Sequence, residues 1–579
     1  MRFSGLLWGA VGLVALFTAS RLPDLGGWDD SFYVGQLTSA VRDRDLLLQD
    51  DLLSFPRPFP ERLRSITTIT DSGAIQNTFS VGFAVLHGSY AWPYVARSEE
   101  RTGQGLRRLL ALGSLGFLVL TVLAIVRLCE EWGFEPGPAR LATVLAMVGG
   151  PLALYGTRLV LNSHLPSAFL ATFVLLGLRR LALTGSRPAW VATGLVTGLL
   201  VINRWQDLVL LAAGLPLAVA WAARREGVRR PTRGEVALGA VCFTGVVMLQ
   251  ALAWRAQFSS WLLVPQGEGY VSWTAPHLVP FLLSTWNGVL PWAPGLALGL
   301  ALAPFLRPRS EAPGARALRS GLLLVLLLAL YVSATPRDWW GGDSYGPRRL
   351  ASLTPVAAIG LAGLLERLRP SVRPWLVLPF CAWGVITSSA FLSHYDDLSV
   401  LLRGVPGPFN PRPTSAYEGL HWVDPWGPLY TLKPGFTFTN APGNVDRLWG
   451  LAACAVVVGL ATWGWRLAVR SSRLRRVLLA GAVAWVFVCG AWLALAVRPN
   501  GERNTWWRAV VRDEPRPSPA PPLPPGAVDA ANLLGAVRAF RAGDEAAFRS
   551  SWDALRRRGA FGLSEVELRQ SAGGAEARP

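Results

Sequence analysis

The sequence carries little charge for its length. Of its 579 residues, 16% are charged and 51% are hydrophobic, whereas roughly a quarter of the residues of a soluble domain are charged. The hydrophobic residues form long uninterrupted runs such as Leu322–Val332, and runs of about 17–25 apolar residues are typical of membrane-spanning helices. The scarcity of charge therefore excludes an ordinary soluble domain and predicts an all-α polytopic membrane protein.

Lysine and metal-binding motifs are also missing. Lys433 is the only lysine, so the net charge of +19 comes from arginine. The arginines lie in short clusters between hydrophobic runs, as topology signals do, which excludes a nucleic-acid partner. The five scattered cysteines show no CxxC spacing and the five histidines no HExxH spacing, so no local motif for a metal is present.

The hydrophobic runs predict about thirteen spans and no internal repeat. They are 4–20, 106–126, 141–157, 165–180, 189–202, 207–222, 236–254, 284–306, 320–335, 350–366, 374–392, 447–466 and 477–497. The apolar stretch Phe79–Tyr94 is a re-entrant or interfacial helix in this scheme, and the alternative that it crosses the membrane stays open.

The arginine clusters orient these spans. They fall in the short connections at 179–187, 224–233, 307–319, 367–373 and 466–476. Short cytoplasmic connections carry an excess of arginine and lysine, so the N-terminus is assigned to the cytoplasm. The chain is then a multi-pass protein of a bacterial inner (plasma) membrane, with the C-terminal tail in the periplasm or outside the cell.

This topology divides the chain into three parts. Residues 1–497 form the transmembrane domain, which includes a large first exported loop (21–105) and a second large exported loop (393–446). A proline-rich linker (498–526) follows, because a segment such as Asp513–Gly526 favours an extended conformation. The helical patterning within residues 527–579 predicts a small helical tail. This tail is an accessory module that is too short for much independent stability.

Two adjacent acids stand where the first span leaves the membrane. Asp29 and Asp30 follow the first hydrophobic run, and Tyr33 is four residues beyond Asp29, which places Asp29 and Tyr33 on one face of a helix. Polar groups at a membrane boundary often mark function. The alternative is that the acids merely stabilise the start of a helix near Ser31.

Further polar residues are predicted on the same exported side. Three connections between spans supply them: Asn162 and His164; Arg204 and Gln206; and Trp340, Asp343, Tyr345, Arg348 and Arg349. Each has a structural alternative, since an interfacial histidine, arginines that reach toward lipid headgroups and tryptophan anchors are common at membrane boundaries.

Four more acids follow in the first loop. They are Asp43, Asp45, Asp50 and Asp51, and we expect them to be solvated loop charges.

Arginine binds phosphate through two parallel hydrogen bonds, and a carboxylate accepts a proton from an attacking hydroxyl. Aromatic rings stack on sugars. Together these residue types predict transfer of a sugar from a lipid-linked carrier.

Short motifs strengthen this interpretation. The chain resembles the GT-C glycosyltransferase superfamily, in particular its protein-mannosyltransferase and aminoarabinose-transferase-like branch. Residues 28–33 (WDDSFY) are similar to a D-E-x-x-Y segment, with Asp30 in place of the usual glutamate. Residues 77–82 (NTFSVG), 162–169 (NSHLPSAF), 198–206 (GLLVINRWQ) and 343–348 (DSYGPR) resemble further segments of that group in the same order.

The resemblance implies a GT-C-like fold, a polyprenyl-phosphate sugar donor and an inverting transfer outside the cytoplasm. It implies that Asp29 is the catalytic base, that Asp30 is a supporting acid or metal contact, and that Arg204 and Arg348 bind the carrier phosphate. It allows a divalent metal without requiring one. The acceptor is a lipid, a polysaccharide or a protein, and membrane lipids surround the protein.

Two alternatives remain open: a non-enzymatic transporter or flippase of a lipid-linked saccharide, and a scaffold in cell-envelope glycan assembly. Transporters tend to place charges near the middle of broken spans, whereas the acids here lie at the boundary.

Overall fold

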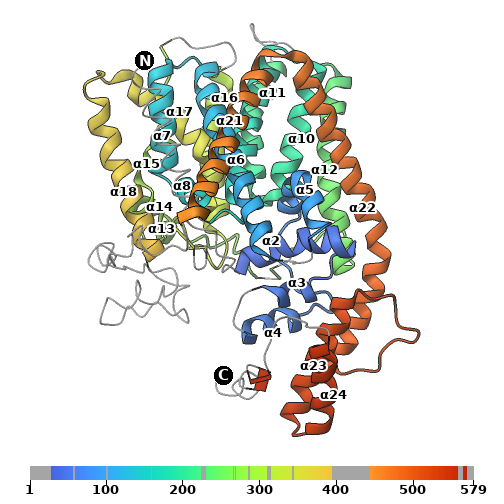
Figure 1. The fold of residues 1–579 in the computed structure, drawn as a ribbon. Helices are drawn as coiled ribbons and strands as arrows, with labels where there is room; N and C mark the ends of the chain where they lie inside the picture. The colour runs from blue at the N-terminus through green and yellow to red at the C-terminus, as the bar shows by residue number, and fades with distance from the viewer. Residues whose placement is uncertain are drawn as a thin grey trace. The chain divides into compact units, whose positions relative to one another are not determined.

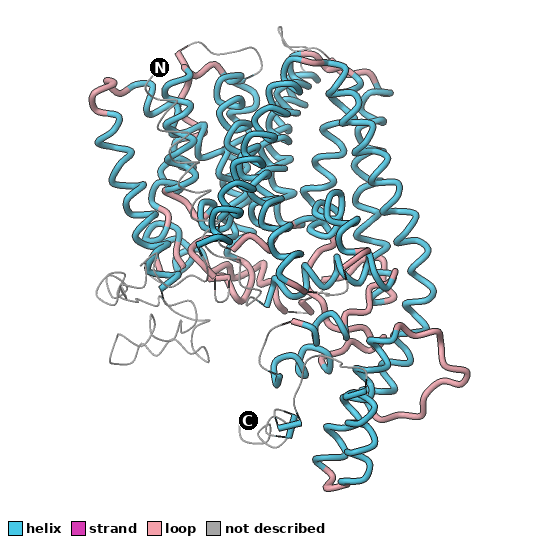
Figure 2. Tube along the Cα trace, viewed as in Figure 1, coloured by secondary structure: helices cyan, strands magenta, loops and turns pink. Residues whose placement is uncertain are grey.

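The regular secondary structure of the described residues is helical. The computed structural model describes residues 28–55, 59–98, 102–157, 159–222, 230–264, 266–267, 269–284, 287–309, 315–341, 344–393, 444–557, 565–566 and 568–569. Within these ranges no strand is present, and only isolated β-bridges join Ile69 to Ile75 and Val271 to Pro336 (Figure 2). The predicted all-α class is confirmed.

Among the residues that the structure describes, six helices are long and apolar enough to cross a membrane. They are Gln104–Trp132, His164–Leu183, Arg233–Phe258, Arg316–Ala334, Arg348–Arg367 and Ser472–Val497. Their number and composition support a multi-pass membrane protein. The predicted count of thirteen is not confirmed. The predicted first span, 4–20, lies outside the described residues.

Several predicted spans are interrupted. Residues 141–157 divide into α7 (Pro136–Val148) and α8 (Leu152–Thr157), because Pro151 cannot donate the next helical hydrogen bond. Residues 284–306 divide in the same way at Pro294 into α14 (Val289–Trp292) and α15 (Pro294–Leu302).

The chain forms two compact units, described separately here. Unit 1 contains residues 111–244 and 268–480 of the described chain, and unit 2 contains residues 28–110, 245–267 and 481 onward. Besides the helices above, unit 1 contains α9 (His164–Leu183), α10 (Arg187–Asn203), the 3₁₀ helix η2 (Trp205–Gly214), α11 (Leu215–Ala222), α13 (Leu278–Leu283), α16 (Ala315–Ala334), the 3₁₀ helix η3 (Arg348–Leu353), α17 (Thr354–Arg367), α18 (Arg373–Ser393) and α21 (Asn444–Arg470).

Helix α17 lies at the centre of unit 1. It packs on α7 and α15 (Figure 1), and it is almost entirely buried. Small residues allow this close approach, since a side chain on Gly360 would collide with the carbonyl oxygen of Gly299, and one on Gly299 would lie 2.5 Å from the carbonyl oxygen of Ala357. Small residues at helix contacts are typical of membrane bundles.

Unit 2 combines the first loop with the C-terminal part of the chain. Its loop helices are α2 (Trp28–Thr38), the π-helix η1 (Ser39–Asp43), α3 (Gln49–Ser54), α4 (Phe59–Thr67) and α5 (Gly82–Val95); its tail helices are α23 (Pro525–Arg541) and α24 (Glu545–Arg557). Helices α6 (Gln104–Trp132), α12 (Arg233–Phe258) and α22 (Ser472–Arg512) contain residues of both units.

Helix α22 is much longer than the predicted last span. It has 41 residues, or about 60 Å at 1.5 Å per residue, and it continues through residues 498–512, which the sequence places in the linker. Asn500, Asn504 and Trp507 on this extension hold neighbouring segments: they hydrogen-bond to the backbone of Leu46, of Ala256 and Gln257, and of Ile66.

The tail packs into the core of the first loop. One hydrophobic cluster joins Phe32, Leu53 and Ile66 of the loop to Trp507 of α22 and to the tail. The tail contributes Leu533, Leu534, Val537, Phe548 and Trp552 to this cluster. The tail is therefore an integral part of this core, and its hydrophobic face is buried by the loop.

Replacement of Gly526 with alanine should loosen the tail. The new Cβ would lie 2.5 Å from the Cβ of buried Asp50, so α3 and α23 must separate. We expect faster proteolytic cleavage in the proline-rich segment and a lower melting temperature. Gly501→Ala is the matched control, because nothing lies within 4 Å of that position. Equal behaviour of the two variants would contradict this packing.

Candidate functional site

The predicted site residues divide between the two units. Asp29, Asp30 and Tyr33 belong to unit 2, and the residues from Asn162 to Arg349 belong to unit 1. Asp343 lies outside the described residues, as does most of the predicted loop 393–446. The two sets are described in turn.

In unit 1, the chain brings His164, Arg204 and Arg348 together; we term them the arginine group. His164 begins α9, Arg204 ends α10 with an extended backbone (φ −152°, ψ 106°), and Arg348 begins η3. Nη1 of Arg204 lies 3.0 Å from Nδ1 of His164 and donates to the carbonyl oxygen of Arg348 at 3.4 Å. Three connections far apart in the sequence thus meet at one point.

The contacts of His164 fix its tautomer. A guanidinium can only donate hydrogen bonds, so Nδ1 of His164 accepts from Arg204. An imidazole whose Nδ1 accepts a hydrogen bond carries its proton on Nε2. His164 is therefore neutral, and it orients Arg204 without adding a third positive charge.

Asp207 is a member of this neighbourhood that the sequence analysis does not select. It is buried, accepts a hydrogen bond from Oγ of Ser352 at 2.7 Å, and interacts electrostatically with Arg204. Its position three residues after Arg204, at the start of η2, is the signal that could have found it. Guanidiniums are the side chains that bind phosphate and carboxylate groups through paired hydrogen bonds, so this neighbourhood suits an anionic ligand.

A scaffold of buried side chains supports the arginine group. The hydroxyl of Tyr155 accepts from the backbone N–H of Tyr345 at 3.1 Å and donates to its carbonyl oxygen at 3.2 Å. The ring of Tyr155 lies 4.5 Å from that of His164. Asn162 accepts from the N–H of His164 at 3.0 Å and so fixes the start of α9. These contacts give Tyr345 and Asn162 supporting roles.

Arg349 has a partner of its own. Its Nη2 lies 2.7 Å from Oδ1 of Asp338, and the hydroxyl of Tyr270 donates to the same oxygen at 2.5 Å. Burial raises the pKa of Tyr270 to about 12, so this phenol stays protonated at neutral pH. The ion pair compensates the charge of Arg349.

Trp340 and Gln206 are the remaining predicted site residues of unit 1, and their surroundings differ. Trp340 is buried, its carbonyl oxygen accepts from Asn287 at 3.1 Å, and its ring meets that of Trp339 edge-on. This packing favours a structural role over sugar stacking. Gln206 is half-buried, and its Nε2 has no hydrogen-bond partner among the described residues, so it can serve a ligand.

In unit 2, the acid pair lies within the first turn of α2 rather than ahead of the helix. Asp29 is half-buried, whereas Asp30 is buried. Tyr33 packs against Phe79 and Phe83, with ring centroids 5.0 and 5.2 Å apart. Asp29 thus remains the more accessible acid, and Tyr33 anchors the helix beneath it.

The acids Asp45, Asp50 and Asp51 are buried, so the prediction that they are solvated is wrong; Asp43 is half-buried. The reason is tertiary: α23 packs on α3, and Gly526 lies directly against Asp50. Polar neighbours offset part of the cost, since Oγ1 of Thr38 donates to Asp51 at 2.5 Å and Arg503 pairs with Asp45.

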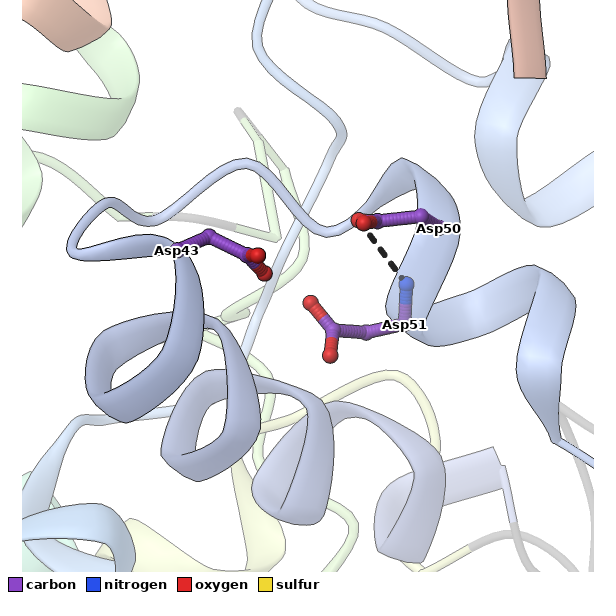
Figure 3. A group of neighbouring side chains, drawn as sticks. All are labelled: Asp43, Asp50 and Asp51. Atoms are coloured by element: carbon purple, nitrogen blue, oxygen red, sulfur yellow. Dashed lines mark hydrogen bonds between the residues drawn. The ribbon is translucent and has the colours of Figure 1, made fainter. Parts of the chain in front are cut away.

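Three of these acids face one another (Figure 3). Oxygens of Asp43, Asp50 and Asp51 lie within 4.8 Å of one another, and the N–H of Asp51 donates to Asp50 at 3.1 Å. Carboxylate oxygens are the ligand type that Mg²⁺ and Ca²⁺ prefer. Among the described residues, neither Asp29 nor Asp30 belongs to this group of three acids.

The chain was also compared with known proteins. No family model and no curated protein matches it. Two solved structures that match are the Archaeoglobus fulgidus oligosaccharyltransferase in the apo form (14% identity, TM-score 0.39), and the Archaeoglobus fulgidus oligosaccharyltransferase AglB in complex with an inhibitory peptide and a dolichol-phosphate (14% identity, TM-score 0.35).

These matches cover 78% and 72% of this chain, and they span 63% and 60% of the two solved chains. The proposed membership in the mannosyltransferase and aminoarabinose-transferase-like branch stays a prediction.

The stability of unit 2 should depend on the protonation of Asp45. Burial, and then the charge of Asp43, raise the pKa of Asp45 from 3.8 to about 7. The folded state therefore holds a proton that the unfolded state has lost, so the free energy of unfolding falls as pH rises from 3.8 to about 7. The Asp45→Asn variant should show a flatter dependence of melting temperature on pH across this window. An unchanged slope would show that other groups cause it.

Proposed function

We propose that the chain is an integral membrane glycosyltransferase of GT-C type. It transfers one sugar from a polyprenyl-phosphate carrier to a hydroxyl of an acceptor on the exported side. The bond between the anomeric carbon and the carrier phosphate breaks, and a bond to the acceptor oxygen forms. The acceptor proton passes to Asp29, and the electron pair leaves with the phosphate.

The arginine group is the observation that carries this proposal. Arg204 is almost fully buried, and its guanidinium donates to the backbone of Arg348 at the start of η3. Burial of a charge is costly unless the charge is compensated, and Asp207 interacts electrostatically with Arg204. A phosphate leaving group could accept hydrogen bonds from these arginines, and donors that face its developing charge would lower the barrier.

The exposure of the acid pair distinguishes its two members. Asp29 is half-buried and Asp30 is buried, so Asp29 is the carboxylate that an acceptor hydroxyl can reach. A phosphate leaves without protonation, so one carboxylate suffices, in contrast to the two acids of glycoside hydrolysis.

The packing within unit 2 bears on where the first loop and the tail lie, and it supports an exported location for both. Residues of the two segments share one hydrophobic core, so they lie on the same side of the membrane. The arginine clusters assign that side to the exterior. In a bacterium this orientation places the reaction at the outer face of the inner membrane.

Replacement of Asp29 with asparagine should abolish transfer. The substitution keeps the shape and removes the proton acceptor, and we expect kcat to fall by about 10²–10⁴-fold. The assay uses protein reconstituted with a radiolabelled polyprenyl-phosphate sugar and membrane acceptors. Asp71→Asn is the matched control, because Asp71 is a fully exposed acid of the same loop. Equal activity of the two variants would exclude Asp29 as the base.

Replacement of Arg204 with alanine should lower kcat by about 10²–10³-fold, because a donor to the departing phosphate is lost. Arg337→Ala, at an exposed position in the connection that precedes η3, is the control. If the wild-type protein transfers no sugar but moves the lipid-linked saccharide across vesicles, the flippase alternative holds instead.

A further inference from the structure

An apolar pocket lies within unit 2, beside the helix that carries Asp29. It is partly open, and α2, η1, α5 and α22 line it. Its walls include Leu37, Val85, Trp92, Trp485 and Trp492. The pocket is therefore a hydrocarbon-like environment built from elements distant in the sequence.

The walls are held in place by specific contacts. Nε1 of Trp485 donates to the carbonyl oxygen of Val85 at 2.8 Å, which ties α22 to α5. The rings of Trp92 and Trp485 meet edge-on, 6.1 Å apart. Gly88 leaves space where its absent side chain would otherwise approach Trp485 and Leu37 at about 3.4 and 3.5 Å. These contacts fix the positions of the pocket's walls.

The pocket lies along a membrane-spanning segment. Trp485, Val488 and Trp492 belong to the candidate span Ser472–Val497. Val488 lines the pocket and is 53% exposed, so the mouth opens on the exposed face of that span. At this depth the surrounding solvent is the lipid chain region, and the occupant of an apolar pocket there is a lipid chain.

The register of α2 connects this pocket to the acid pair. Asp29, Tyr33 and Gln36 are spaced at i, i+4 and i+7, which places them along one helix face, and Gln36 lines the pocket. Seven residues correspond to a rise of about 10 Å. A lipid with its chain in the pocket therefore presents its head group toward Asp29.

Gln36 ties α2 to the segment before α5. Its Nε2 donates to the carbonyl oxygen of Phe79 at 3.0 Å, and its side chain is fully buried. The surface that the pocket offers to a ligand is therefore apolar, as a hydrocarbon chain requires.

We infer that this pocket binds the hydrocarbon chain of the acceptor, and hence that the acceptor is a membrane lipid. The inference rests on the proposed function, in which Asp29 accepts the acceptor's proton and Arg204 and Arg348 bind the carrier. The pocket shares its helix with the base and none of its elements with those arginines. It therefore belongs to the acceptor rather than to the polyprenyl chain of the donor.

A substitution that fills the pocket tests this assignment. Ala84 is a small lining residue on α5, and phenylalanine there would occupy the cavity. The control is Ala491→Phe, at an exposed position of α22 that does not line the pocket. Both variants leave Asp29 and the arginine group unaltered, and circular dichroism with melting curves checks that each is folded.

The kinetic experiment compares two acceptors with one head group, one carrying a long acyl chain and one a short, water-soluble chain. With Ala84→Phe we expect KM for the long-chain acceptor to rise about tenfold, or about 1.4 kcal/mol, through lost burial of apolar surface. KM for the short-chain acceptor and for the polyprenyl-phosphate donor should not change. A rise in the donor KM instead would assign the pocket to the carrier and overturn the inference.

A binding experiment separates this inference from the proposed function. The wild-type protein is reconstituted in vesicles of phosphatidylethanolamine that contain a fraction with a diazirine on the acyl chain, and labelled peptides are mapped after illumination. We expect labels on α5 and α22 that Ala84→Phe suppresses and Ala491→Phe does not.

Labelling without any sugar transfer would contradict the proposed function while the lipid pocket stands. Absence of labelling, or its displacement by polyprenyl phosphate but not by excess unlabelled phospholipid, would overturn the pocket assignment even in an active enzyme.

Discussion

The packing of the α22 extension and the tail against the first loop is the contact on which unit 2 depends. Trp507 of α22 contributes a large buried side chain and donates to the backbone of Ile66, and α23 covers α3. The loop helices α3 and α4 have only six and nine residues, too few to be stable alone in water. Their structure therefore comes from burial supplied by the end of the chain.

Burial of this kind explains which sequence predictions failed. Hydrophobic runs predicted the helices, because a membrane-spanning helix needs little beyond apolar length. The loop acids looked solvated because their neighbours in the sequence are polar, and nothing local to Asp50 indicates that Gly526 will lie against it. The predicted spans that divide at Pro151 and Pro294 carried their own signal, since proline interrupts the helical hydrogen-bond ladder.

Part of the candidate site could likewise be predicted from the sequence. Arg204, His164 and Arg348 could be found because each stands where a hydrophobic run ends, and the structure brings them together. Asp207 was missed because its importance comes from contact with Arg204 and Ser352, which sequence spacing does not reveal. The pairing of Arg349 with Asp338 was hidden for the same reason, and it separates two adjacent arginines that look equivalent in the sequence.

The shared core of loop and tail has a consequence for biogenesis. Ribosomal synthesis delivers residues 28–95 several hundred residues before Leu533, Phe548 and Trp552, which complete their core. During that interval the loop helices expose the apolar side chains and clustered carboxylates that the tail later covers. The nascent protein therefore needs protection of that surface until α23 and α24 are made, and a chain that stops before α23 leaves the loop core permanently open.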